Sequence, residues 1–108
     1  KHYELNSNIT QDVPISYNQE EALKDADFVY AKNWSNYHDY GKIVSVDENW
    51  MLTNEKLGNA KFMHCLPVRR NVVVEDAVLD GENSLVIEQA NNRTYAAQIV
   101  LKNILKTL

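Results

Sequence analysis

The sequence of 108 residues is poor in several features that define whole classes of protein. A single cysteine, Cys65, cannot form a disulfide within the chain, so the fold needs no oxidising compartment. The 3 glycines and 2 prolines provide no flexible linker, and there is no low-complexity tract or internal repeat. Neither a glycine-rich phosphate loop nor a Gly-x-Gly-x-x-Gly motif is present, which disfavours a dinucleotide-binding domain of the NAD type.

Long runs of one charge or of apolar residues are also missing. The chain has 11 Lys+Arg against 15 Asp+Glu, a net charge of −4, and no basic cluster that would bind nucleic acid. No apolar stretch approaches the roughly 18 residues that span a bilayer, and the first residues lack the pattern of a signal peptide. Three scattered histidines (His2, His38 and His64) and one cysteine do not suggest a metal site. We therefore expect a cytoplasmic protein without metal, cofactor, membrane or nucleic-acid partner.

Short β-favouring segments alternate with helical segments along the chain. We predict strands at 13–17, 28–31, 61–65 and 84–88, and helices at 19–25, 48–57, 72–79 and 91–108. Asn18, Asp47 and Asn91 are suitable N-caps for three of these helices. This order, with 44% hydrophobic residues, predicts an α/β domain with a mostly parallel sheet. Residues 1–12 are polar and begin without a cap or turn, as expected for a cut edge.

The predicted last helix carries one apolar stripe opposite polar residues. The stripe comprises Ala97, Val100, Leu101, Ile104 and Leu108, with Gln98, Lys102 and Lys106 on the other side. We expect the stripe to pack on more than this chain's own sheet. Ligands of open α/β sheets bind beyond the carboxyl ends of the strands, so the loops after Tyr30, Met63 and Ile87 are the candidate ligand loops.

The loop after Met63 concentrates reactive side chains within eight residues, from His64 to Asn71. Arg69 and Arg70 could bind a phosphate or carboxylate, because the planar guanidinium donates two parallel hydrogen bonds. Cys65 beside cationic groups could alternatively act as a nucleophile. A third possibility is a buried cysteine next to a solvated arginine pair. Composition alone leaves these three alternatives open.

Two motifs nevertheless resemble those of a known family. His64-Cys65-Leu66-Pro67 is similar to the His-Cys-Leu-Pro signature of the ornithine and aspartate carbamoyltransferase superfamily, and residues 84–93 resemble its last strand and the Asn-Arg that opens its terminal helix. The resemblance covers essentially the whole chain. It implies an α/β fold, namely a portion of a mostly parallel, Rossmann-like, three-layer sheet domain that ends in a long helix. Family members have two domains and about 300 residues, a length at which single cores usually divide. Residues 1–108 would then be the C-terminal part of the acceptor-binding domain, without the N-terminal carbamoyl phosphate domain.

The resemblance also assigns roles to individual residues. Cys65, Leu66 and Arg93 are expected to bind carbamoyl phosphate, with Cys65 and Arg93 contributing to catalysis. Arg93 would lie in the first turn of the last helix, where anions are favoured. His64 and Pro67 are expected to be structural or orienting residues, with a cis peptide between Leu66 and Pro67. The family's Ser-Thr-Arg-Thr phosphate loop is not found in the sequence, so we expect this segment to be inactive alone. The resemblance also implies that the full protein is a homotrimer.

The loop after Tyr30 differs from that of ornithine carbamoyltransferases, where an acid binds the α-ammonium of ornithine. Lys32 stands in that place and would repel an ammonium, while suiting an acceptor whose α-nitrogen is acylated. Residues 64–71 also match the version found in N-acetylornithine and N-succinylornithine carbamoyltransferases. The resemblance thus predicts that Lys32, Asn33, Leu66 and Arg69 bind an N-acylated ornithine, and a pairing of Arg69 with a carboxylate favours the succinyl group.

Three other functions remain open at this point. One is an ornithine carbamoyltransferase with an atypical acceptor loop, and another is a non-catalytic binding module of the same fold. The third is a cysteine-dependent enzyme of a different class.

Overall fold

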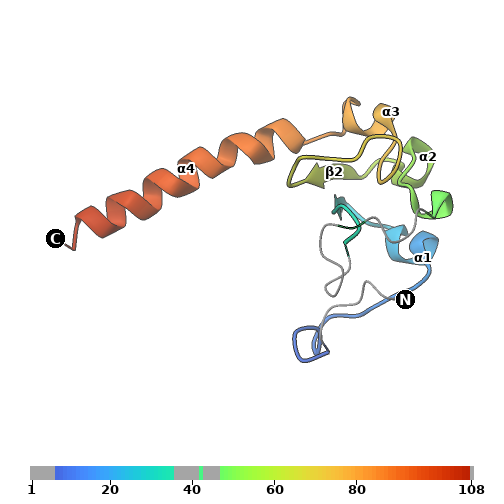
Figure 1. The fold of residues 1–108 in the computed structure, drawn as a ribbon, viewed down its shortest axis with the longest axis horizontal. Helices are drawn as coiled ribbons and strands as arrows, with labels where there is room; N and C mark the ends of the chain where they lie inside the picture. The colour runs from blue at the N-terminus through green and yellow to red at the C-terminus, as the bar shows by residue number, and fades with distance from the viewer. Residues whose placement is uncertain (1–6, 36–41, 43–46, 108) are drawn as a thin grey trace.

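The computed structural model describes residues 7–35, 42 and 47–107. Its elements, in chain order (Figure 1), are α1 (Gln19–Leu23), β1 (Phe28–Ala31), the 3-10 helix η1 (Glu48–Trp50), α2 (Asn54–Leu57), β2 (Lys61–His64), α3 (Asp76–Leu79) and α4 (Val86–Leu105). The order of helices and parallel strands confirms the α/β class that the sequence predicts.

The two strands form a parallel sheet in which Phe28 pairs with Lys61 and Ala31 with His64. Side chains alternate between the two faces of a strand, so Val29 and Phe62 share one face while Phe28 and Tyr30 belong to the other. Isolated parallel bridges extend the pairing from Phe62 to Ser84 and, outside the sheet, from Leu52 to Val74. Both strands therefore end at one edge, which places the loops after them side by side.

The core lies on one face of the sheet. It consists of Leu52, Leu57, Ala60, Phe62, Val74, Val78, Leu79 and Val86, with Leu23, Val29, Ala31 and Val68 packed against it. Phe62 and Val74 are completely buried. The opposite face is not covered in the same way, because Phe28 and Tyr30 remain 64% and 55% exposed. Three layers are expected. The described residues form the sheet and the layer that covers one of its faces.

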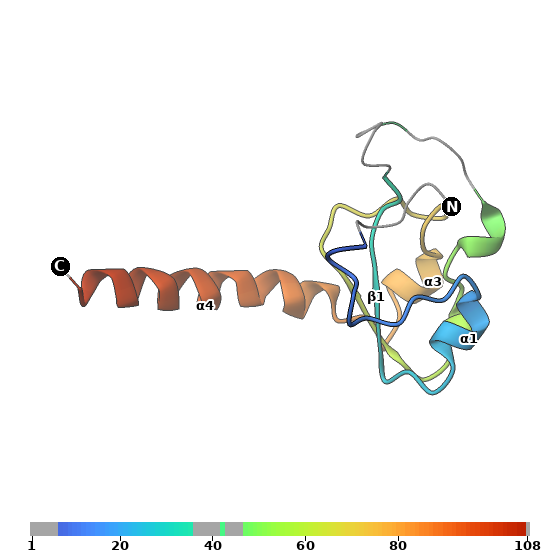
Figure 2. The ribbon, with the colours of Figure 1, turned by 90° about the horizontal axis from the view of Figure 1, so that it is seen from below.

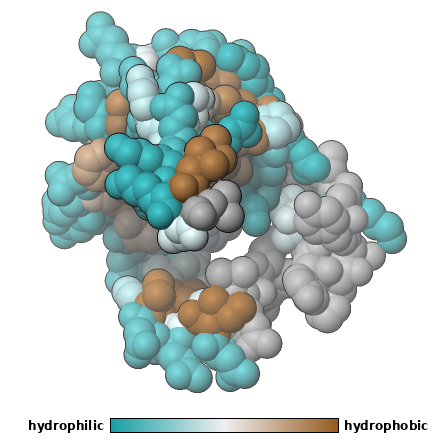
Figure 3. All heavy atoms as spheres, turned by 90° about the vertical axis from the view of Figure 1, so that its left-hand side faces the viewer, coloured by the Kyte–Doolittle hydropathy of each residue, from teal (hydrophilic) through white to brown (hydrophobic). Residues whose placement is uncertain are grey.

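Helix α4 projects from this body as a long arm that ends at the C-terminus (Figures 1 and 2). Only Val86, its first residue, is buried, and Val100, Leu101 and Ile104 are each more than half exposed. The view onto the C-terminal end of α4 shows hydrophobic side chains at the surface beside hydrophilic ones (Figure 3). The predicted stripe is thus not covered by the described residues of this chain, while Leu108 lies outside them.

Two of the predicted N-terminal elements are confirmed and a third is wrong. The Asn18 side chain accepts a hydrogen bond from the backbone N–H of Glu21 and caps α1, which ends at Leu23 rather than at Asp25. Strand β1 occupies 28–31 as predicted. Residues 13–17 do not form a strand, because no described strand pairs with them and Pro14 has no N–H to donate. Residues 36–41 of the predicted loop after β1 lie outside the described part of the chain.

The helix predicted at 48–57 is divided into η1 and α2 because Leu52 takes part in strand-like pairing. Its N–H donates to the Val73 carbonyl (2.9 Å), and its carbonyl accepts from the Glu75 N–H (3.0 Å). The same pairing keeps Val73 and Val74 out of the helix predicted at 72–79, so α3 begins only at Asp76. Long-range backbone pairing therefore overrides two local helix signals.

The strand predicted at 84–88 and the predicted start of the last helix are both wrong. The strand-like pairing ends after one bridge, where the N–H of Leu85 donates to the Phe62 carbonyl at 2.8 Å. Helix α4 then starts at Val86, whose side chain is anchored in the core. Asn91 is consequently inside the helix rather than at its N-cap, and Ile87 is not followed by a loop.

Candidate functional site

A hollow of about 500 Å³ opens at the carboxyl end of β2. It is lined by His64, Cys65, Leu66, Pro67, Gln89, Ala90 and Arg93. The first four residues come from the end of β2 and the loop after it, and the other three come from the N-terminal half of α4. The structure thus brings together every residue that the resemblance assigns to carbamoyl phosphate, namely Cys65, Leu66 and Arg93, with both residues predicted to orient them.

The position of Arg93 within its helix differs from the prediction. Arg93 lies seven residues after Val86, the first residue of α4, and so in the helix interior. The unpaired N–H groups that attract anions belong to the first turn of a helix, so they do not contribute at Arg93. Any affinity of Arg93 for an anion must come from its own guanidinium.

His64 holds the loop after β2 through its side chain. Its Nδ1 accepts a hydrogen bond from the N–H of Leu66 at 2.9 Å, so the neutral imidazole carries its hydrogen on Nε2. The side chain is 1% exposed, and Nε2 has no partner among the described residues. Burial lowers the pKa of His64 and favours this neutral form. These contacts fix the backbone of Leu66, while an orienting role of His64 toward a ligand stays a prediction.

Gln89 is a site residue that the sequence analysis did not identify. Its Oε1 accepts from the N–H of His64 (3.0 Å), and its Nε2 donates to the hydroxyl of Tyr30 (3.1 Å). One amide side chain thereby links α4 to both strands and helps to fix α4 against the hollow. The sequence predicts a strand at 84–88 and a helix only from residue 91, so it places Gln89 in a loop and gives no reason to expect contacts with β1 and β2.

The loop after β2 contains the predicted cis peptide between Leu66 and Pro67. Leu66 also has a positive φ of 45°, which residues with a side chain seldom adopt. The side-chain amide of Asn33 contacts this loop twice: Nδ2 donates to the Pro67 carbonyl (2.8 Å), and Oδ1 accepts from the N–H of Arg69 (3.1 Å). The structure therefore joins the loops that carry Asn33 and Arg69.

The two adjacent arginines have different surroundings. Nη1 of Arg70 lies 2.8 Å from Asp76 Oδ1 and 2.7 Å from Asp80 Oδ2, and Nη2 donates to Asp80 Oδ1 at 2.8 Å. Hydrogen bonds to Asp80 and Asp76 raise the pKa of Arg70, and hydrogen bonds from Arg70 lower the pKa of both carboxyl groups. Arg69 is half-buried, and its guanidinium makes no ion pair or hydrogen bond with the described residues. Arg69 is thus the member of the pair that remains available to a ligand.

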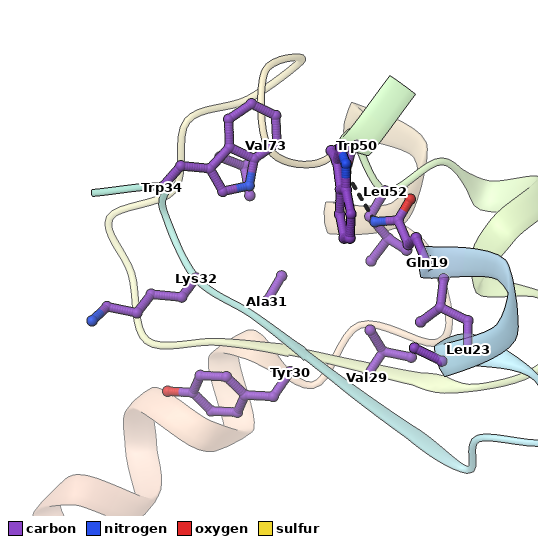
Figure 4. Close-up of a pocket in the computed structure, with 11 residues that line it drawn as sticks. Gln19, Leu23, Val29, Tyr30, Ala31, Lys32, Trp34, Trp50, Leu52 and Val73 are labelled. Atoms are coloured by element: carbon purple, nitrogen blue, oxygen red, sulfur yellow. Dashed lines mark hydrogen bonds between the residues drawn. The ribbon is translucent and has the colours of Figure 1, made fainter. Parts of the chain in front are cut away.

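Lys32 follows β1 and lies at the rim of a second hollow of about 240 Å³ (Figure 4). This hollow is mainly apolar and aromatic, and its lining includes Trp34, Trp50, Leu52 and Val73. The Lys32 ammonium points away from these residues (Figure 4). Lys32 does not line the hollow that holds Cys65 and Arg93, so the structure leaves its predicted contact with an acceptor untested.

Within the described ranges, no helix is long and apolar enough to cross a membrane. In the same residues no three or more His, Cys, Asp or Glu side chains are grouped as they would be to hold a metal ion.

Comparison with known proteins identifies the family. The family model described as "Aspartate/ornithine carbamoyltransferase, Asp/Orn binding domain" matches residues 1–104. The N-succinylornithine carbamoyltransferase of Bacteroides fragilis (strain 638R) is 44% identical over 111 residues, which cover 98% of this chain and 35% of that protein. The N-acetylornithine carbamoyltransferase of Xylella fastidiosa is 37% identical over 100 residues, which cover 81% of this chain and 29% of that protein.

Solved structures agree with this result. A variant of N-acetyl-L-ornithine transcarbamylase, complexed with carbamyl phosphate and N-succinyl-L-norvaline, superposes with a TM-score of 0.70 at 30% identity. The match covers 85% of this chain and 34% of that one, so this chain spans about a third of the length of its relatives. From its two motifs, its fold and these matches, the chain belongs to the aspartate/ornithine carbamoyltransferase family.

Proposed function

We propose that the protein containing this chain transfers the carbamoyl group of carbamoyl phosphate to the side-chain amine of an N-acylated ornithine, with N-succinylornithine as the favoured acceptor, in arginine biosynthesis. The observation that carries the proposal is the hollow in which Cys65, Leu66 and Arg93 meet. The 44% identity to an N-succinylornithine carbamoyltransferase supports the choice of acceptor.

The reaction requires an uncharged primary amine to attack the carbamoyl carbon. A tetrahedral oxyanion forms, the bond from that carbon to the phosphate oxygen breaks, and a proton passes from the amine nitrogen to the leaving phosphate. Arg93 faces the hollow from α4 and would stabilise negative charge on the leaving phosphate. Cys65 and the backbone of Leu66 would contact the carbamoyl group, and no covalent intermediate on Cys65 is needed. Cys65→Ser should therefore slow turnover without abolishing it.

Acceptor selection is assigned to the two loops at the carboxyl edge of the sheet. The Arg69 guanidinium has no partner among the described residues and would pair with the succinyl carboxylate. Lys32 stands where an ornithine enzyme would carry an acid, and its positive charge disfavours a free α-ammonium. Because an acetyl group has no carboxylate, it would gain nothing from Arg69. The preferred order is then succinyl, acetyl, and free ornithine last.

We also propose that a second, N-terminal domain completes the site and that the assembled protein is a homotrimer. Residues 1–108 contain no Ser-Thr-Arg-Thr phosphate loop, and the apolar surface of α4 is uncovered by the described residues. The chain alone should accordingly fail to turn over. Sustained turnover by residues 1–108 would contradict this part of the proposal.

The test is a comparison of kcat/KM for N-succinylornithine, N-acetylornithine and ornithine, measured with the full protein and with Arg69→Ala. Arg69→Ala should reduce kcat/KM most for the succinyl substrate, because its carboxylate would be left partly desolvated without a cation. Asn59→Ala, at an exposed position before β2, serves as the control. A wild-type preference for free ornithine would show the alternative, an ornithine carbamoyltransferase with an unusual loop. A protein inactive on all three would be a binding module.

A further inference from the structure

The side chain of Asn33 occupies the junction of the two loops that leave the sheet at its carboxyl edge. Asn33 belongs to the loop after β1, whereas Pro67 and Arg69 belong to the loop after β2. The Asn33 Nδ2 donates to the Pro67 carbonyl at 2.8 Å, and Oδ1 accepts from the Arg69 N–H at 3.1 Å. A single planar amide therefore fixes the spacing of the two loops.

Arg69 is held through its backbone and left free at its side chain. Its N–H donates to Asn33, and its carbonyl accepts from the N–H of Val73 at 3.0 Å. The neighbouring Arg70 is engaged with Asp76 and Asp80, so it cannot replace Arg69 without losing those contacts. The Arg69 side chain thus extends from a residue whose backbone N–H and carbonyl are both hydrogen-bonded.

We propose that Asn33 is a positioning residue that aims the Arg69 guanidinium, and that it thereby sets the selectivity of the protein among N-acylated ornithines. The inference rests on the proposed function for its substrate class. A guanidinium binds a carboxylate best when both N–H groups lie in the plane of the carboxylate, so a small displacement of the Arg69 backbone weakens that pairing. An acceptor without the distal carboxylate does not depend on this alignment.

Loss of the Asn33 amide would release the part-buried N–H of Arg69 and the carbonyl of Pro67. Both groups would then need other partners, most simply water, and the loop after β2 would move to reach them. The Arg69 guanidinium would keep its charge, but its orientation would no longer be fixed. We therefore expect the effect of Asn33 to appear as lost discrimination between acceptors rather than as a general loss of activity.

Amide hydrogen exchange in the full protein tests the contact itself. Asn33→Leu should speed exchange at the Arg69 N–H, whereas Asn33→Asp keeps an oxygen acceptor and should retain protection there. Asn59→Leu is the matched amide-to-leucine control and should leave Arg69 unaffected. If Asn33→Leu does not fold, Asn33→Ala is used in its place. Unchanged exchange at Arg69 in a folded Asn33→Leu or Asn33→Ala protein would overturn the proposal.

A double-mutant cycle with Arg69→Ala tests the functional role. Asn33→Leu should lower the ratio of kcat/KM for the succinyl over the acetyl substrate by roughly tenfold, about the effect of losing one hydrogen bond. It should raise KM for the succinyl acceptor and leave KM for carbamoyl phosphate unchanged. In the Arg69→Ala background the same substitution should not lower the ratio further. An additive effect would show that Asn33 acts on the acceptor independently of Arg69.

The two experiments separate this inference from the proposed function. A wild-type protein that carbamoylates no acylornithine would overturn the proposed function and the selectivity role together, while hydrogen exchange would still decide whether Asn33 holds Arg69. An active, succinyl-selective wild type with an unaltered ratio in Asn33→Leu would overturn the role of Asn33 alone.

Discussion

Arg69 and Arg70 are adjacent in sequence, but their guanidinium groups have different surroundings. Arg70 and its two aspartates are exposed, so the separate ion pairs stabilise the fold weakly, but together they tie the loop after β2 to α3. The same contacts occupy the Arg70 guanidinium with Asp76 and Asp80. Of the two adjacent arginines, Arg69 is thus the one whose guanidinium has no ion pair among the described residues.

Arg93 provides a direct test of the phosphate site. In the full protein, Arg93→Ala should weaken carbamoyl phosphate binding by on the order of 1.5–3 kcal/mol, the cost of losing a hydrogen bond to a charged group. Lys102→Ala removes the same charge from a more C-terminal position on α4, away from the hollow, and should have little effect. Isothermal titration measures both affinities. Equal affinities in wild type and Arg93→Ala would show that the assignment is wrong.

His64 should make the stability of the protein depend on pH. Burial lowers its folded-state pKa below the usual 6.5, so below that pH the unfolded state binds more protons than the folded state. The contribution of neutral His64 to the free energy of unfolding is fully present above pH 6.5. It is lost as the pH falls toward the folded-state pKa, because a protonated Nδ1 can no longer accept the hydrogen bond from the N–H of Leu66.

The measurement is the free energy of unfolding in urea between about pH 7.5 and about pH 5, with a loss of about 1.4 kcal/mol for each unit of pKa shift. His64→Gln cannot titrate and should show a shallower pH dependence, whatever its absolute stability. An identical slope in the two proteins would exclude His64 as the source.

The sequence predicts those candidate site residues that lie together in one short motif. Cys65, Leu66 and Pro67 are adjacent in sequence, and the cis peptide belongs to the same motif. Gln89 could not be predicted because its importance arises from contacts with His64 and Tyr30, both at least 25 residues away. The engagement of Arg70 depends similarly on where α3 begins, which local propensity did not determine.

At the scale of the elements, helix starts are defined by capping groups where a suitable side chain is present. Asn18 caps α1, and Thr53 accepts from the N–H of Lys56 to cap α2. Helix α4 has no side-chain cap, and its start is fixed by the burial of Val86. This tertiary contact is the physical reason why Asn91 was a misleading signal.

The cap of α1 can be tested by Asn18→Ala. Removal of the side chain leaves the N–H of Glu21 without its acceptor, which should reduce the free energy of unfolding by about 1 kcal/mol. Denaturation by urea measures this change, and Asn59→Ala at an exposed site outside any helix is the control. A destabilisation no larger than that of the control would mean that the cap does not stabilise α1.

For the whole molecule, the contrast between a compact body and a protruding α4 indicates where the rest of the protein should make contact. A lone helix in water is marginal, and most helix stability comes from packing of an apolar face. More than half of the surface of Val100, Leu101 and Ile104 is exposed. These residues form the surface that we expect the proposed second domain to cover.

Leu101→Asp tests this expectation at the level of assembly. In the full protein the substitution should reduce stability by at least about 2 kcal/mol, because a buried leucine would be replaced by a carboxylate. In residues 1–108 alone it should have little effect, since Leu101 is 57% exposed there. Thermal unfolding of both forms gives the comparison, and Gln98→Asp controls for the added charge. A small effect in the full protein would place the domain contact elsewhere.

The free side of β1 has a consequence for the behaviour of the chain in isolation. Among the described residues β1 pairs with β2 along one edge only, and Phe28–Ala31 contains no charged residue that would discourage another strand. Unpaired backbone groups on such an edge can hydrogen-bond to an additional strand, and the exposed aromatic rings of Phe28 and Tyr30 add apolar surface that favours association. We therefore expect Phe28–Ala31 to promote aggregation when residues 1–108 are studied alone.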